Sequence, residues 1–195
     1  MKKNLISILI LVFCVVSGRA QEVQDTIMRH AKMIEKRDDS TKVLKERYYT
    51  INDTVRVGTY VAFYDNGDTL FSGQYKSGKR DGKWTWRYMK GLKQMEGVYI
   101  AGLREGLWES WWPNIVKQSS GNYKKDKEDG KWTFWFDNET KKSEGNFKEG
   151  LEEGSWKYFD ETGMLRTEGK YKKGELDGTW SIFDETGELA EKVKY

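Results

Sequence analysis

Aromatic and glycine residues recur along most of this chain at a fixed step of 24 positions. We number each 24-residue unit from a glycine, and six units then begin near Gly58, Gly82, Gly106, Gly130, Gly154 and Gly178. Two positions after each glycine stands an aromatic residue: Tyr60 in the first unit, then Trp84, Trp108, Trp132, Trp156 and Trp180. A constant period without insertions or deletions is the signature of a repeat architecture.

Five of the six units also carry a second glycine at position +15, and all six carry an aromatic residue at +17. The second glycines are Gly73, Gly97, Gly121, Gly145 and Gly169. Short alternating segments separated by turn residues such as Asp65-Asn66-Gly67 are typical of β-hairpins. Two or more glycines per unit would repeatedly break a helix. The pattern therefore predicts an all-β fold, namely an elongated single-layer antiparallel sheet of repeated hairpins.

A single layer has no second sheet against which to bury its side chains, so its rings must pack over neighbouring strands. Side chains three positions apart in a strand lie on opposite faces, so the rings at +2 and +5, such as Trp132 and Trp135, cover both. A glycine at +15 leaves room for a ring from the adjacent strand to lie flat on the backbone. We therefore assign structural roles to two columns: Trp84, Trp108, Trp132, Trp156 and Trp180, and Gly97, Gly121, Gly145 and Gly169.

The segment before the repeats has a different pattern. Val23, Ile27, Ala31 and Ile34 are spaced by four, four and three positions, which is the stripe of an amphipathic helix. We therefore expect residues 21–42 to form a short N-terminal helical segment. The repeats would occupy residues 43–195, with a degenerate half-repeat before the six full units.

The first twenty residues have the features of a secretory signal peptide. Lys2 and Lys3 precede an apolar run, and Ser17-Gly18-Arg19-Ala20 supplies small residues before a cut at Gln21. The apolar run is too short to span a bilayer comfortably. We predict that residues 1–20 are removed and that the protein is exported, to the periplasm, the outer envelope or the medium. The single cysteine, Cys14, would leave with this leader.

The net charge of the chain does not predict a class of partner. The chain holds 34 basic and 31 acidic residues. The leader contains three basic residues, Lys2, Lys3 and Arg19, and no acidic one, so the mature chain balances at 31 against 31. This balance gives no electrostatic reason to expect nucleic acid, and it makes membrane lipid an unexpected partner.

The sequence offers little for catalysis. Its single histidine, His30, falls in the helical segment, where a surface position is the simplest interpretation. We find no phosphate loop, nucleophile elbow or metal-ligand spacing. We therefore predict a protein that is not an enzyme, with no catalytic, metal-binding or cofactor-binding residues and no cofactor.

The middle units carry more aromatic residues than the columns require. Exposed rings on a rigid sheet suit contact with a protein or stacking on a glycan. The other interpretation is that these rings only thicken a thin core. The candidate partner-contact residues are Trp86, Tyr88, Trp111, Trp112, Trp135 and Phe136.

The stretch from Gly169 to Trp180, with Tyr171, Gly174, Asp177 and Gly178, resembles the MORN repeat. It looks most like the 24-residue bacterial variant, whose members are often labelled antitoxin-like, and the resemblance covers about residues 57–195. It implies an elongated sheet of hairpins and a role in binding or scaffolding rather than catalysis. Residues 155–165 are also similar to the choline- or glucan-binding repeats of wall-attached proteins.

These observations lead to one hypothesis and two alternatives. The hypothesis is an exported non-catalytic binding or scaffold module that presents its repeat sheet to a protein or envelope partner. The first alternative is a carbohydrate-binding or cell-wall-binding module that uses exposed aromatic residues. The second is an antitoxin-like protein that neutralises its partner.

Overall fold

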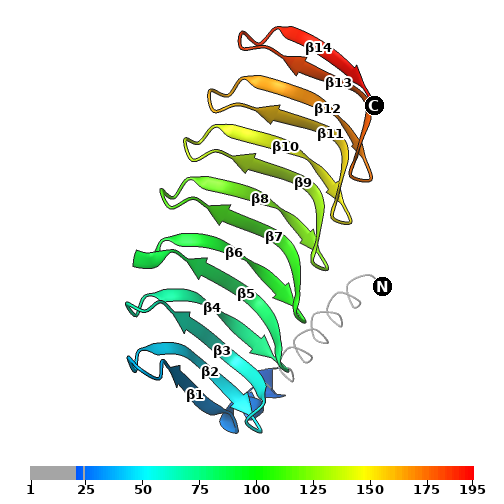
Figure 1. Ribbon diagram of the computed structural model, residues 1–195. Helices are drawn as coiled ribbons and strands as arrows, with labels where there is room; N and C mark the ends of the chain where they lie inside the picture. Colours follow the sequence, from blue (N-terminus) through cyan, green and yellow to red (C-terminus); the bar gives the residue numbers. More distant parts are fainter. Residues whose placement is uncertain (1–20, 24) are drawn as a thin grey trace, which may run out of the picture.

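A computed structural model describes residues 21–23 and 25–195 of the chain, and the predicted signal peptide lies outside them. A short helix at residues 21–29 is followed by fourteen strands in one antiparallel sheet, ordered as in the sequence (Figure 1). The predicted all-β single-layer fold is confirmed. The strands are β1 Lys32–Arg37, β2 Leu44–Ile51, β3 Val55–Phe63, β4 Thr69–Lys76, β5 Lys79–Arg87, β6 Lys93–Ile100, β7 Leu103–Trp111, β8 Lys117–Lys124, β9 Lys127–Trp135, β10 Lys141–Lys148, β11 Leu151–Phe159, β12 Leu165–Lys172, β13 Glu175–Phe183 and β14 Leu189–Lys194.

The N-terminal segment corrects the expectation of a helix extending over residues 21–42. The helix ends near His30, whose amide donates to the carbonyl of Ile27, and β1 begins at Lys32. Strand β1 pairs with β2, so the half-repeat expected from residue 43 is completed to a hairpin. The apolar spacing did not predict the strand because it carries no information on β2. The backbone N–H and C=O groups at the edge of β2 are paired by a strand at residues 32–37 and would be left unpaired by a helix there. Ile34 accordingly packs against the aromatic core of the sheet.

Two kinds of turn connect the strands, one along each long edge of the sheet. On the edge that we call the short-turn edge, two residues with positive φ form each turn, for example Ala101 (51°) and Gly102 (94°). Such values are those of a type I′ turn, whose twist matches that of paired strands. On the other edge, the long-turn edge, each turn is longer and includes residues 64–68, 88–92, 112–116, 136–140, 160–164 and 184–188. Figure 1 shows the two edges on opposite sides of the ribbon.

Every odd-numbered strand from β3 onward is bent at the first glycine of its unit. In the pairing of β6 with β7, Val98 faces Glu105 and Glu96 faces Glu109, so three residues of β7 lie opposite the single residue Gly97. Gly106, inside this bulge, has a φ of 67°, which a residue with a side chain adopts only at a cost. Because the bulge recurs in each unit, the bends align along the sheet and make it a trough (Figure 1).

The core consists of tryptophan rings lying on glycines of the preceding strand. A Cβ added to Gly97 would stand 2.1 Å from Cδ2 of Trp108, and the same relation holds for the other four Trp–Gly pairs. The indole Nε1 of Trp108 donates to the carbonyl of Val98 at 3.2 Å, which satisfies its polar atom. These tryptophans are at most 5% exposed. The predicted fit of an adjacent ring onto the +15 glycine is therefore what holds the single layer together.

Candidate functional site

The bend gives the sheet two distinct faces. Arg80 and Trp84 lie on one strand, four residues apart, yet Arg80 Cζ is only 4.5 Å from the centre of the Trp84 ring. In a straight strand these positions would be about 13 Å apart, so both side chains point into the inside of the bend. We call this the concave face; it carries positions −2, +2, +4, +15 and +17 of each unit. The convex face carries the alternate positions.

Arginine at position −2 lines the first half of the concave face. Arg104 Cζ lies 3.8 Å from the ring centre of Tyr123, and Arg56 Cζ lies 5.0 Å from that of Tyr48. Stacking of a guanidinium on aromatic rings stabilises it by about 0.5–2 kcal/mol while leaving its edge to donate hydrogen bonds. The three arginines, Arg56, Arg80 and Arg104, are half-buried. They form a row of cations set among rings.

The same column becomes acidic in the second half, with Glu128 and Glu152 in place of arginine. The hydroxyl of Tyr123 donates to Glu128 Oε1 at 2.9 Å. Burial, and then this bond to a carboxylate, raise the pKa of the Tyr123 hydroxyl to about 12. The concave face thus changes from positive to negative along its length while the tryptophan and glycine columns stay the same.

The convex face carries the +5 rings, and a lysine lies over three of them, Trp111, Trp135 and Phe159. Lys93 Nζ lies 4.7 Å from the ring centre of Trp111, and Lys117 Nζ lies 5.9 Å from that of Trp135. Lys93 also pairs with Glu96 at 3.0 Å, as does Lys83. Partial burial acts against ionisation of Glu96, but the bonds from the two lysines outweigh it and hold the pKa of this carboxyl below its ordinary value. These rings are half-buried rather than open to solvent.

Side chains at the long-turn edge link each turn to the next. Tyr64 donates through its hydroxyl to the carbonyl of Arg87 at 2.8 Å, and Tyr88 donates to that of Trp111 at 2.9 Å. Trp112 continues the series with its Nε1, which donates to the carbonyl of Trp135 at 3.1 Å. Rings at this edge therefore hold the spacing of the hairpins.

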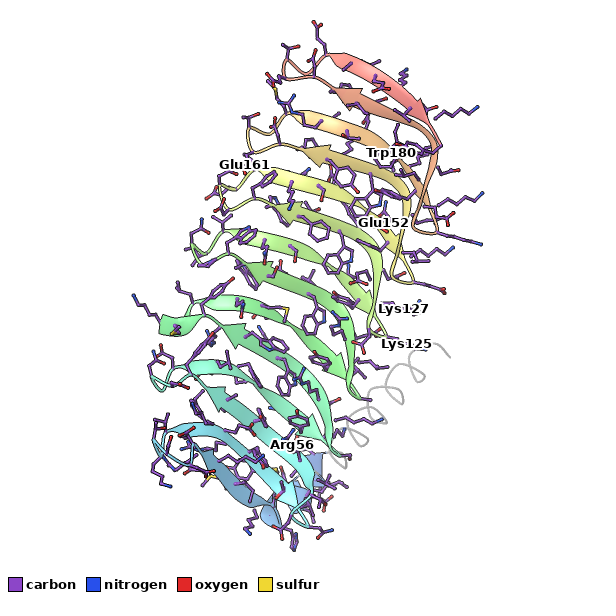
Figure 2. All side chains as sticks on the ribbon, viewed as in Figure 1. Arg56, Lys125, Lys127, Glu152, Glu161 and Trp180 are labelled. Carbon is purple, nitrogen blue, oxygen red and sulfur yellow. The ribbon has the colours of Figure 1, made fainter. Side chains whose placement is uncertain are left out.

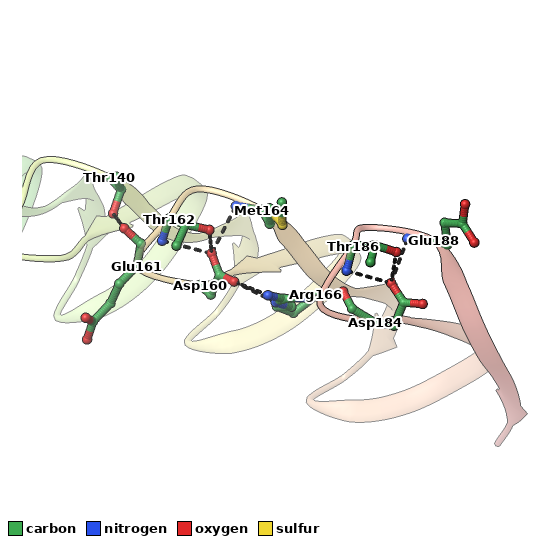
Figure 3. A network of polar contacts seen from close by, with 9 residues as sticks. All are labelled: Thr140, Asp160, Glu161, Thr162, Met164, Arg166, Asp184, Thr186 and Glu188. Atoms are coloured by element: carbon green, nitrogen blue, oxygen red, sulfur yellow. Dashed lines mark hydrogen bonds and ion pairs between the residues drawn. The ribbon is translucent and has the colours of Figure 1, made fainter.

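Toward the C-terminus, carboxylates order the individual turns and Arg166 links one turn to the next (Figure 3). Asp160 Oδ1 accepts from the hydroxyl of Thr162 at 2.6 Å and from the amide of Met164 at 3.0 Å, and Oδ2 accepts from Arg166 Nε at 2.6 Å. Arg166 also donates to the carbonyl of Asp184 in the next turn. The bond from Thr162, followed by that from Arg166, lowers the pKa of Asp160 to about 2. Asp160 therefore orders its own turn and positions Arg166 against the next one.

The six candidate partner-contact residues do not form one surface. Trp86 lies on the concave face, with its ring centre 5.9 Å from that of Trp84 and 5.7 Å from that of Trp108. Two others are on the convex face and three are at the long-turn edge. All six are half-buried, and their role in contacting a partner stays a prediction. By location they are Trp86 (concave), Trp111 and Trp135 (convex), and Tyr88, Trp112 and Phe136 (edge).

Sequence reasoning missed the arginine column. Its signal was present, since Arg56, Arg80 and Arg104 are also separated by 24 positions. The spacing alone does not reveal that a bulge folds position −2 over the ring at +2. Figure 2 shows Arg56 and Glu152 at different heights along the trough.

Lysines are concentrated at the short-turn edge. Lys125 and Lys127 lie on that edge, opposite Glu161 on the long-turn edge (Figure 2). A hollow of about 370 Å³ lies between two adjacent turns there, and its lining combines lysines with two carboxylates. The lining residues are Lys124, Lys125, Lys127, Asp129, Lys148 and Glu149.

His30 is exposed and its Nδ1 lies 2.9 Å from the carbonyl of Thr26. Within residues 21–23 and 25–195, no three His, Cys, Asp or Glu side chains stand close enough together to hold a metal ion. No helix in this part of the chain has the length and apolar character needed to cross a membrane.

The trough of bent hairpins, with a tryptophan lying on a glycine in five of the six units, defines a repeat protein of the single-layer β class. Residues 128–149, 152–173 and 176–195 match the family described as MORN repeat variant. These three consecutive units are therefore MORN repeats, as the sequence resemblance indicated. No curated protein matches the chain. MORN repeats and a repeat sheet fit a binding or scaffold module in general terms.

Proposed function

We propose that this chain is an exported, non-catalytic binding or scaffold module that presents its repeat sheet to a protein or another envelope component. The change of charge in the −2 column of the concave face carries this proposal. Arg80 and Arg104 become Glu128 and Glu152 although the tryptophan–glycine packing is the same in these units. Since the fold tolerates either charge, the division into a basic and an acidic half serves something outside the fold.

A partner that matches this face has acidic groups opposite the first three units and basic groups opposite the next two. Opposed charges of this kind orient two proteins and suppress wrong partners more than they add affinity. A protein surface can provide such a two-signed pattern, whereas a neutral polysaccharide cannot. The protein partner is therefore preferred to the glycan.

The test is capture of partners from an envelope extract on purified residues 21–195, beside retention on insoluble peptidoglycan and polysaccharide. A variant with Arg80→Glu and Arg104→Glu installs at two positions the residue that later units carry. Because Arg104→Glu also removes the ion pair with Asp126, retention of the fold is checked by circular dichroism. The matched control, Lys170→Glu with Lys172→Glu, makes the same charge change on the convex face. The proposal predicts a stoichiometric protein that the first variant loses and the control keeps.

Equal capture by both variants would overturn the concave-face assignment. Retention on a glycan that free sugar competes away, without a protein partner, would instead favour the carbohydrate-binding alternative. An intracellular toxin recovered as the stoichiometric partner would favour the antitoxin-like alternative.

Export is a separate part of the proposal and rests on the leader pattern of residues 1–20. It predicts that the protein recovered from the cell envelope or medium begins at Gln21. Mass spectrometry of the intact protein after cell fractionation measures this directly. A full-length chain that starts at Met1 and stays in the cytoplasm would contradict it.

A further inference from the structure

One hairpin departs from its neighbours on the convex face near the short-turn edge. Four aliphatic side chains of β6 and β7 are exposed there: Val98 by 38%, Ile100 by 57%, Leu103 by 43% and Leu107 by 54%. We call these four residues the β6–β7 patch. Contiguous exposed apolar side chains with a polar rim are characteristic of an interaction site.

The pairing of the strands places the patch residues together. Ile100 pairs with Leu103 across the turn, and Val98 lies one alternation away from Ile100 on β6. Tyr99 and Arg104, which pair with each other, point to the concave face, so these three aliphatic residues point to the convex one. Leu107 precedes Trp108 in β7 and therefore also faces the convex side.

The fold does not require aliphatic residues at these four positions. The units on both sides carry lysine or an amide residue in the same columns and form the same hairpins. The corresponding residues are Gln74, Lys76, Lys79 and Lys83 before the patch, and Asn122, Lys124, Lys127 and Lys131 after it. Val98, Ile100 and Leu107 thus interrupt otherwise polar columns at one unit only, whereas the column of Leu103 also contains the exposed residues Val55 and Leu151.

The lysines flanking the patch keep their charges available. Lys76, Lys79, Lys124 and Lys127 are exposed, and none of them forms an ion pair with another residue in the described part of the chain. Two carboxylates beside the patch already accept backbone amides: Asp81 Oδ1 from Ala101 at 3.2 Å and Glu105 Oε2 from Lys125 at 2.9 Å. The rim therefore presents the ammonium groups of the four lysines.

We propose that the β6–β7 patch docks an amphipathic segment of a partner protein, with aliphatic side chains on one face and aspartate or glutamate on its flanks. The aliphatic side chains of the segment would cover the patch, and its carboxylates would meet the two rows of lysines. This inference deepens the binding function proposed above and rests on it.

The shape of the patch favours a segment over a membrane or a second copy of the chain. Lysine rows on β5 and β8 are three strand spacings apart, roughly 14 Å, and an α-helix is about 10–12 Å wide. Lysine side chains reach farther than those of leucine, so a flat bilayer would meet the ammonium groups before the patch. Two copies docked patch to patch would set lysines against lysines.

The experiment selects binders from a displayed library of random peptides of about 16 residues, enough for four helical turns. Selection is run on purified residues 21–195 and on a variant carrying Ile100→Lys, Leu103→Lys and Leu107→Lys. This patch variant introduces at each position the lysine that the neighbouring units carry there, so it should fold as they do. A control with Leu151→Lys, Ser155→Lys and Thr179→Lys adds the same charge on the convex face of later units.

The expected result is enrichment of peptides that combine aliphatic residues at helical spacing with flanking acidic residues. A synthetic peptide of the enriched sequence, followed by fluorescence anisotropy, should bind the patch variant at least about 30-fold more weakly than the unchanged chain, the effect of losing a central contact cluster. The control should bind within about threefold. Added salt should weaken binding because the lysines of the rim are exposed.

Three results would overturn the inference: no enrichment of acidic amphipathic peptides, equal binding to the patch variant, or patch-dependent binding of phosphatidylglycerol vesicles or of a second copy alone. The concave-face proposal has a separate readout in the Arg80→Glu, Arg104→Glu variant. A failed peptide selection together with a partner lost in that variant would remove the patch and leave the proposed function in place.

Discussion

Gly97→Ala should destabilise the sheet through one ring. The new Cβ would stand 2.1 Å from Cδ2 of Trp108 and 2.2 Å from its Cε2, so the indole must move. Trp108 is 3% exposed, its ring centre lies 5.1 Å from that of Tyr99, and its Nε1 hydrogen bond to Val98 is 3.2 Å long.

Overpacking costs about 1–3 kcal/mol, and complete loss of a buried tryptophan costs about 3–5 kcal/mol. Because the ring is displaced rather than deleted, we expect Gly97→Ala to lower the free energy of unfolding by about 2–4 kcal/mol. Urea denaturation followed by the fluorescence of the remaining tryptophans measures it. Hydrogen exchange should show the loss of protection concentrated in β6–β8, because each repeat contacts only its neighbours.

Two controls separate the clash from backbone strain. Gly106→Ala meets no atom within 4 Å but has a φ of 67°, so it should cost only about 1–2 kcal/mol. In a Trp108→Ala background, Gly97→Ala should cost almost nothing, since the ring it strikes is gone. An undiminished cost in that background, or a cost below about 0.5 kcal/mol in the original chain, would refute the account of the core.

Further expectations concern the turns and the N-terminal strand. The pKa of the Asp160 carboxyl should be about 2 by NMR titration. Because this pKa lies below the ordinary value of 3.8, the ionised carboxylate stabilises the fold above pH 3.8, and this stabilisation is lost as the pH falls toward 2. An unshifted pKa would contradict the turn network. Trp112→Phe removes the donor to the carbonyl of Trp135 and should lower the free energy of unfolding by about 0.5–1.5 kcal/mol, measured by thermal or urea unfolding. Phe136→Leu breaks no such bond and should leave the hydrogen-exchange protection of the adjacent turns unchanged. Amides of Lys32–Arg37 that bond to β2 should show an alternating protection pattern in hydrogen exchange; uniform helical protection there would restore the original expectation for this segment.

The architecture could be predicted from the sequence because five of the six units repeat the same packing of a ring on the backbone of the preceding strand. Trp132 can lie on the backbone of the preceding strand only if Gly121 has no side chain, and the constant spacing of these two residues makes that pairing visible in the sequence. Periodicity therefore predicted the strands, their order and the core.

What the sequence did not predict depends on contacts between segments. Met33 pairs with Tyr49, a pairing that local apolar spacing does not encode, and so β1 was mistaken for part of a helix. Trp111 and Trp112 are adjacent in sequence, yet one faces the convex side under Lys93 and the other bonds along the long-turn edge. The number of aromatic residues suggested a single binding surface, but strand alternation and turn position distribute them over three.

The most direct test of the central claim is a hydrogen-exchange footprint of residues 21–195 in complex with the protein partner captured from the envelope. The account predicts new protection in the repeat sheet, along the strands that carry Arg80, Arg104 and Glu128, with the β6–β7 hairpin included if the patch docks the same partner. Protection confined to residues 21–31, or a complex in which the sheet exchanges as it does alone, would contradict the claim that the repeat sheet is the binding surface.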